Sequence, residues 1–245
     1  MSFKWISHRG ESMDAPENSI AAFRLSLERR TDGMECDVHL TADGQVVVAH
    51  DEHTGRMGDR LLEISENTLE ELRKVNISGA CEQYPDEHIP LLSEVLPLLG
   101  EGRVFYIELK PGCPALVPAV AQVLAGSGIP AEQIVIISFD KELITLSKKQ
   151  MPQYCALWLA SLWDRSITAG SLLKELEAMN ADGIDICINE YLITPEFVRT
   201  MHEAGKIVAV WTIDQPHQAK RMIDIGVDAV TSNRAAKLRQ ILSKR

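Results

Sequence analysis

The feature that most constrains the fold of this chain is a regular alternation of short apolar segments with helical ones from residue 103 onward. Each apolar segment has the length of a strand, and each following segment carries apolar residues at helical spacing. With the earlier segments included, the predicted barrel strands cover residues 3–7, 34–40, 103–110, 133–139, 154–160, 183–188, 206–213 and 229–232. Eight strand–helix units in 245 residues predict an α/β fold, a (β/α)8 TIM barrel. The alternative is an open doubly wound sheet, which usually carries a glycine-rich phosphate loop, and no GxGxxG occurs here.

The early part of the chain departs from this alternation. Residues 45–49 read as an extra strand that forms a hairpin with residues 34–40, because Asp43-Gly44 supplies a tight turn. Residues 52–89 are polar and loop-like, with one helical piece near 68–75, and read as a small insertion within a single domain covering 1–245. The other predicted helices run from an entry at 16–19 to about residue 30, and over 92–99, 114–125, 141–150, 171–179, 195–204, 216–225 and 235–243.

Charge and targeting signals restrict the partners of the chain. A formal net charge of −10 argues against a broad nucleic-acid or anionic-membrane surface, although a local basic pocket for one phosphate is compatible with it. The first residues lack the apolar run of a secretory signal, and no stretch approaches the ~20 apolar residues of a spanning helix. The five cysteines show no CxxC spacing and read as reduced thiols. We therefore expect a cytoplasmic protein with no nucleic-acid partner and no stable membrane association; its oligomeric state is open.

Two carboxylates on one predicted strand are the first chemical signal. Glu35 and Asp37 point to the same face of the strand, while Cys36 and Val38 point to the other. Two acids on one face of a buried strand repel each other and are costly to desolvate. A divalent cation would compensate for this, and so would turn capping or pairing with arginine.

Further polar residues follow the ends of other predicted strands, where the catalytic groups of such barrels lie. This end of the barrel gathers His8, Arg9, Glu35, Asp37, His50, Glu108, Lys110 and Trp211. Three carboxylates are hard ligands suited to one Mg²⁺ or Ca²⁺. Arginine and lysine beside a cation suit a phosphate group, and two histidines supply an acid and a base. The residues therefore point to metal-assisted phosphoester chemistry.

The motifs in their order resemble those of the glycerophosphodiester phosphodiesterases over nearly the whole chain. The resemblance is carried by His8-Arg9-Gly10, Pro16-Glu17-Asn18-Ser19, Glu35-Cys36-Asp37-Val38, Thr41-Ala42-Asp43-Gly44, His50-Asp51, Ile89-Pro90-Leu91-Leu92, Glu108-Leu109-Lys110, Ser138-Phe139 and Trp211-Thr212.

The resemblance implies a (β/α)8 barrel enzyme that hydrolyses glycerophosphodiesters to sn-glycerol 3-phosphate and an alcohol. It implies His8 and His50 as the acid–base pair, and Arg9 and Lys110 on the phosphate. It implies Glu35, Asp37 and Glu108 as ligands of Mg²⁺ or Ca²⁺, and it favours Trp211 as a wall for the glycerol moiety. In a mechanism proposed for such enzymes, the glycerol 2-hydroxyl attacks phosphorus and water then opens the cyclic phosphate.

Two segments depart from the family pattern. After His50 the chain reads Asp51-Glu52-His53-Thr54-Gly55-Arg56-Met57, where an Asp-x-x-Leu-x-Arg-Thr-Thr-like run is expected. Near the last strand, Val230-Thr231-Ser232-Asn233 stands where the family often has Ile-Thr-Asp followed by Pro, which removes an acid from the barrel rim. These departures bear on substrate choice. The alternatives are a lysophospholipase D-type or other phosphodiesterase acting on a lipid, and a non-catalytic barrel that binds a phosphorylated metabolite.

Overall fold

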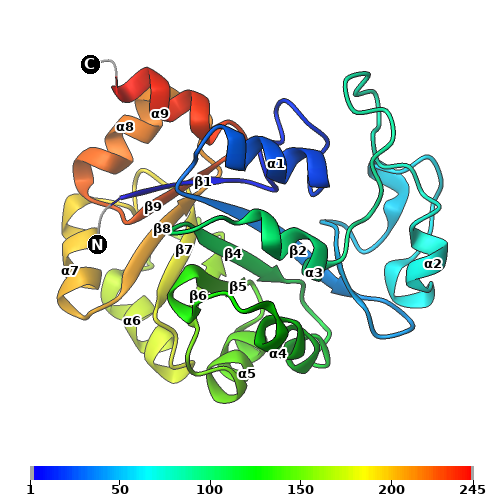
Figure 1. Ribbon diagram of the computed structural model, residues 1–245. Helices are drawn as coiled ribbons and strands as arrows, with labels where there is room; N and C mark the ends of the chain where they lie inside the picture. The colour runs from blue at the N-terminus through cyan, green and yellow to red at the C-terminus, as the bar shows by residue number, and fades with distance from the viewer. Residues whose placement is uncertain (1–2, 244–245) are drawn as a thin grey trace.

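Eight parallel strands close into a barrel at the centre of the computed structural model, which describes residues 3–243 (Figure 1). Their order around the barrel is β1-β9-β8-β7-β6-β5-β4-β2, and pairing of β1 with β2 closes the ring. The predicted TIM barrel is therefore confirmed. The strands are β1 Lys4–Ser7, β2 Gly33–Leu40, β4 Val104–Leu109, β5 Ile134–Ser138, β6 Cys155–Ala160, β7 Gly183–Cys187, β8 Ile207–Trp211 and β9 Ala229–Ser232.

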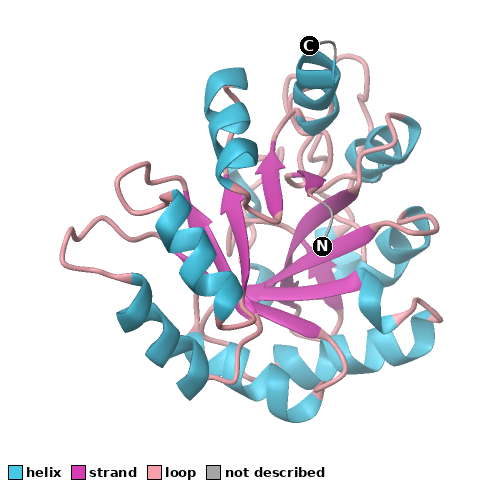
Figure 2. Cartoon of the chain, turned by 90° about the vertical axis from the view of Figure 1, so that its left-hand side faces the viewer, coloured by secondary structure: helices cyan, strands magenta, loops and turns pink. Residues whose placement is uncertain are grey.

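Helices surround the strands on the outside of the barrel, as Figure 2 shows. The helices are α1 Ile20–Glu28, α2 Leu69–Leu72, α3 Leu92–Val95, α4 Leu116–Ser127, α5 Lys141–Gln150, α6 Ala169–Ala178, α7 Pro195–Glu203, α8 Pro216–Ile225 and α9 Ala235–Ser243. The helix predicted over residues 92–99 is wrong in part, because α3 ends at Val95 and a 3₁₀ turn, η3 (Leu96–Leu98), follows. Pro97 lacks the backbone N–H that would continue an α-helix. Within residues 3–243, no helix combines the length and apolar content needed to cross a membrane.

The predicted hairpin is present. Strand β3 (Val46–Val48) pairs antiparallel with β2, with Val48 opposite Val38. The turn between them contains Gly44 at φ +75°, a left-handed conformation that glycine adopts without steric cost.

The segment between β3 and α3 stands to one side of the barrel (right in Figure 1). It contains two 3₁₀ turns, η1 (Thr54–Arg56) and η2 (Ile64–Glu66), and the single helical turn of α2. The helical piece expected near 68–75 is therefore shorter than its sequence pattern suggested. The segment buries a small apolar cluster of its own against β3, made of Val47, Ile64, Leu72, Val75, Ile77 and Ile89.

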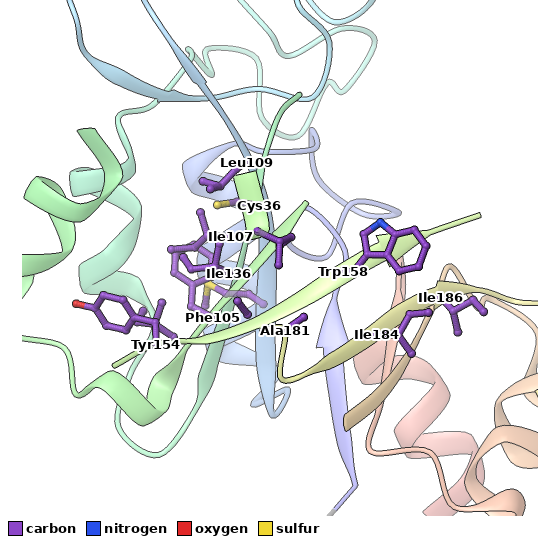
Figure 3. Close-up of a cluster of buried hydrophobic side chains, with 14 of the residues drawn as sticks. Cys36, Phe105, Ile107, Leu109, Ile136, Tyr154, Trp158, Ala181, Ile184 and Ile186 are labelled. Atoms are coloured by element: carbon purple, nitrogen blue, oxygen red, sulfur yellow. The ribbon is translucent and has the colours of Figure 1, made fainter. Parts of the chain in front are cut away.

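Alternation along the strands separates two environments. The outward side chains pack against the helices; Figure 3 shows Cys36, Ile107, Leu109 and Ile136 in this layer. The inward side chains fill the barrel, and they include Ile6, Tyr106, Val135, Ile137, Leu157, Leu159 and Ala209. Apolar residues thus fill most of the barrel interior, and the acids of β2 and β4 also point inward.

Candidate active site

Three buried carboxylates from the neighbouring strands β2 and β4 come together on the inward face of the barrel. The register of the two parallel strands places Asp37 beside Glu108, and Glu35 faces the same way two residues earlier. One oxygen atom from each carboxylate lies within 4.8 Å of the others, and all three residues are buried. The sequence prediction that these acids converge is therefore supported by their placement.

Electrostatics within this cluster favour a bound cation. Burial raises the pKa of Glu35 well above its usual value, and repulsion from Asp37 and Glu108 adds to the shift. Burial and Asp37 raise the pKa of Glu108 to about 8. Three hard oxygen donors, two of which resist ionisation, fit a divalent metal ion, because its charge would favour their ionised forms. The chain therefore has a cluster that could bind a metal ion.

Asp37 differs from its neighbours because two cations contact it. Lys110 Nζ lies 2.6 Å from Asp37 Oδ1 and 2.8 Å from Glu108 Oε1. Arg9 Nε lies 3.2 Å from Asp37 Oδ2. Burial alone would raise the pKa of Asp37, but Lys110 and Arg9 outweigh burial and hold that pKa well below its usual range. Two cations thus lie beside the candidate metal ligands, as an anionic substrate group would require.

The loop after β1 delivers its backbone as well as its side chains. Arg9 has φ +54°, uncommon for a residue other than glycine, and its backbone N–H donates to Glu35 Oε2 at 2.9 Å. Gly10 follows at φ +78°, and a Cβ there would lie 2.6 Å from the backbone carbonyl carbon of Ala22 in α1. The His8-Arg9-Gly10 motif thus requires glycine for close packing against α1.

His8 lies on the Glu35 side of the cluster. Its Nε2 is 4.0 Å from Glu35 Oε2, and its Nδ1 is 2.7 Å from Asn233 Oδ1. Burial and the adjacent Arg9 charge lower the pKa of His8 to about 4. The ring is therefore neutral near pH 7, with Nε2 toward the carboxylates.

His50 lies on the Asp37 side and has an acidic partner. His50 Nδ1 is 2.6 Å from Asp51 Oδ1, and Arg56 Nε donates to Asp51 Oδ2 at 2.7 Å. Arg56 also donates to Glu17, which in turn accepts a hydrogen bond from Arg9 at 2.8 Å. The segment that departs from the family pattern after His50 therefore joins a charged network that reaches Arg9.

Trp211 closes part of the barrel mouth at the end of β8. Its Nε1 donates to the backbone oxygen of Asp185 at 3.1 Å, and its ring meets Phe139 edge to face at 5.6 Å between centroids. Its half-buried indole provides an apolar surface at this end of the barrel.

Two polar contacts of the site are missing from the sequence prediction. Ser19 caps α1, while Asn18 has φ +57° and donates to Asp37 Oδ2 at 2.8 Å. Asn233, which stands where the family often has an acid, lies beside an acid from another loop. Asp214, from the loop after β8, places its Oδ2 2.6 Å from Asn233 Nδ2. The motif Pro16-Glu17-Asn18-Ser19 was a sequence signal that could have identified Asn18 as a site residue. No comparable motif marked Asp214.

Comparison with known proteins identifies the family of the chain. The model of the Glycerophosphoryl diester phosphodiesterase family matches residues 8–237. The chain is 32% identical over 233 residues to a glycerophosphodiester phosphodiesterase of Caldanaerobacter subterraneus subsp. tengcongensis, covering 93% of each chain. It is 30% identical over 246 residues to one from Bacillus altitudinis, covering 97% of this chain and 98% of the relative.

Solved structures show the same likeness. A phosphodiesterase of Oleispira antarctica, determined in complex with the product sn-glycerol-3-phosphate, superimposes with a TM-score of 0.88 at 26% identity. The superposition covers 97% of this chain and 96% of the other. By its fold, its relatives and its family match, the chain belongs to the glycerophosphoryl diester phosphodiesterase family and is an enzyme that hydrolyses glycerophosphodiesters.

Proposed function

We propose that the chain converts a glycerophosphodiester to sn-glycerol 3-phosphate and an alcohol, using one Mg²⁺ or Ca²⁺ held by Glu35, Asp37 and Glu108. The buried carboxylate cluster carries this proposal, since its acids lie within 4.8 Å of one another and two have raised pKa values. When bound, the ion would supply charge stabilisation for the phosphate oxygens. The Oleispira relative, in complex with sn-glycerol-3-phosphate, supports the product assignment.

Arg9 and Lys110 are proposed to bind the phosphate. Both side chains are mostly buried beside Asp37, so their charges act in a region of reduced solvent screening. Arg9 is also held by Glu17 at 2.8 Å, which fixes the guanidinium before substrate arrives. Such preorganised donors stabilise charge that develops on the phosphate oxygens.

His8 and His50 are proposed as base and acid, and their partners support this order. Asn233, a neutral amide, accepts from His8 Nδ1, so the neutral ring keeps its Nε2 lone pair to take the proton of the glycerol 2-hydroxyl. Asp51, a carboxylate, contacts His50 Nδ1 and stabilises a charged ring that can protonate the leaving alcohol oxygen. Water would then open the cyclic phosphate, with the two roles reversed. Trp211 is proposed as the apolar wall for the glycerol carbons.

A lipid-derived diester is the second candidate substrate. Exposed Met13, Phe139, Trp163 and Tyr191 follow β1, β5, β6 and β7, so all four lie at the carboxyl end of the barrel, where the site is. An acyl chain on the leaving group could contact such residues.

The decisive experiment measures sn-glycerol 3-phosphate released from glycerophosphocholine by the purified chain with Mg²⁺, Ca²⁺ or EDTA. Release that EDTA abolishes supports the reaction and the metal requirement together, and the two metal arms identify the working ion. Release that persists in EDTA contradicts the metal assignment. A parallel arm with lysophosphatidylcholine tests the second candidate, and turnover of this lipid alone would replace the first.

A further inference from the structure

Asn233 links His8 to a carboxylate that lies outside the proposed metal cluster. Asn233 is the residue directly after β9. Its Oδ1 lies 2.7 Å from His8 Nδ1, and its Nδ2 lies 2.6 Å from Asp214 Oδ2. Asp214 comes from the loop after β8. A chain of side-chain contacts therefore runs from Asp214 through Asn233 to His8.

The orientation of the Asn233 amide follows from its partners. An ionised carboxylate only accepts hydrogen bonds, so the group facing Asp214 Oδ2 must be the NH₂ of the amide. Rotating the amide by 180° would bring its carbonyl oxygen against the carboxylate oxygen at the same short distance. Ser12 Oγ also donates to Asn233 Oδ1 at 3.1 Å, which agrees with a carbonyl oxygen at that position.

Asp214 is itself held in place by donors. Its Oδ1 accepts from the Asn233 backbone N–H at 3.0 Å and from Ser232 Oγ at 2.8 Å. Arg234 Nε donates to its backbone oxygen at 2.9 Å. The carboxylate thus has a fixed position from which to orient the amide.

The amide in turn selects the tautomer of His8. A carbonyl oxygen 2.7 Å from Nδ1 requires a hydrogen on Nδ1, and a neutral imidazole then has its lone pair on Nε2. Nε2 is the ring nitrogen that faces Glu35, at 4.0 Å. In the other tautomer, Nε2 would carry the hydrogen and could not accept a proton from substrate.

We propose that Asp214 is a positioning residue: through Asn233 it holds neutral His8 in the tautomer protonated at Nδ1, with the Nε2 lone pair facing the phosphate site. The inference rests on the proposed role of His8 as base. It also explains the departure from the family pattern at Asn233. In the pair formed by residues 214 and 233, the acid is at 214 and the amide at 233. Among the described residues, the Asp214 carboxylate has hydrogen bonds with Ser232 and Asn233 and none with His8 or the carboxylate cluster.

Three variants of the full chain test the proposal. Asp214→Asn keeps the shape but allows the Asn233 amide to turn over, so the two His8 tautomers should mix. Asn233→Asp places two carboxylates against each other. The double variant Asp214→Asn/Asn233→Asp restores an acid–amide pair, with the acid now accepting from His8 Nδ1. Asp228→Asn is the matched control, because Asp228 contacts His202 at 2.9 Å and precedes β9 at the opposite end of the barrel.

The direct readout is the ¹⁵N spectrum of histidine in the labelled, metal-free chain at pH 8, where the two ring nitrogens give distinct shifts. We expect a protonated Nδ1 and an unprotonated Nε2 at His8 in the parent chain, in the double variant and in Asp228→Asn. We expect mixed populations in Asp214→Asn. On glycerophosphocholine, kcat of Asp214→Asn should fall roughly tenfold to a hundredfold with little change in KM, and the double variant should recover most of it.

Two results would overturn the inference. One is a His8 tautomer that Asp214→Asn leaves unchanged, because a carboxylate that only supports the loop would give that spectrum. The other is a parent chain with hydrogen on Nε2. These spectra do not depend on turnover, so they remain interpretable if the parent chain hydrolyses no diester, a result that would contradict the proposed function separately.

Discussion

Lys110 Nζ lies 2.6 Å from Asp37 Oδ1, so an ammonium group contacts one of the three carboxylates proposed to hold the cation. The same nitrogen lies 2.8 Å from Glu108 Oε1. A divalent ion bound by these oxygens would have to share them with Lys110 or displace it. The ammonium group would then be available to a phosphate oxygen next to the ion.

Replacing Lys110 should separate metal binding from catalysis. In Lys110→Gln we expect Mg²⁺ or Ca²⁺ to bind at least as tightly as in the parent chain, since a competing positive charge is gone. We expect kcat/KM to fall about ten- to a thousandfold, because a charge on the phosphate is lost. Calorimetric titration with the metal and steady-state kinetics measure the two effects. Lys148→Gln, which removes an ion pair with Asp182, is the control, and weaker metal binding in Lys110→Gln would contradict the prediction.

Glu108→Gln should remove metal binding without unfolding the chain. Burial and Asp37 raise the pKa of Glu108 to about 8, so a neutral amide replaces a carboxyl that resists ionisation. The melting temperature in EDTA should therefore stay close to that of the parent chain, and added metal should stabilise only the parent. Activity should fall at least about a hundredfold.

Thermal unfolding with and without Mg²⁺ or Ca²⁺ measures this difference. Glu142→Gln, at an exposed position early in α5, is the control and should respond to metal as the parent chain does. Equal stabilisation of Glu108→Gln by metal would remove Glu108 from the ligand set.

The two histidines should differ in their dependence on the leaving group. His8→Ala and His50→Ala should each lower kcat by roughly two to four orders of magnitude on a natural diester. In a glycerophosphodiester with a 4-nitrophenyl leaving group, the leaving oxygen needs little protonation. This substrate should therefore restore much of the activity of His50→Ala and little of that of His8→Ala. His88→Ala, in the segment beside the barrel, serves as the control. The reverse pattern would exchange the assigned roles of base and acid.

The barrel and the gathering of the site could be predicted because both follow from short-range patterns. Strand–helix alternation fixes the fold class, and parallel strands carry their end residues to one rim, so Glu35 and Glu108 had to converge. The 3₁₀ turn at Pro97 is a local effect of a missing N–H within an otherwise helical pattern.

The side-chain network around the site could not be predicted in the same way. Arg56 contacts Glu17 across 39 positions, and Asn233 contacts Asp214 across 19. Such contacts depend on the course of loops, which hydrophobic periodicity does not encode. The sequence alone therefore indicated that an acid is lost at residue 233, although Asp214 places a carboxylate beside Asn233.

Asp185 provides a prediction of stability against pH. It faces the barrel interior from β7, and its Oδ1 has no hydrogen-bond partner among the described residues. Burial, with a smaller effect of Glu108, raises its pKa to about 8. The folded chain therefore keeps the Asp185 proton over a range of pH where the unfolded chain has released it. Stability from this group is present in full below about pH 4 and is lost as pH rises toward 8.

Asp185→Asn removes this titration. The free energy of unfolding of the variant should therefore increase relative to that of the parent chain as pH rises from 4 to 8. The slope is at most about 1.4 kcal/mol per pH unit in that window, and the gain should level off above pH 8. Urea unfolding at pH 5, 6.5 and 8 measures the difference. Asp224→Asn, which alters only an exposed pair with Lys220, should follow the parent chain at each pH. If the free energies of unfolding of Asp185→Asn and the parent chain change with pH in parallel, Asp185 is ionised in the folded barrel over this range. The prediction would then be wrong.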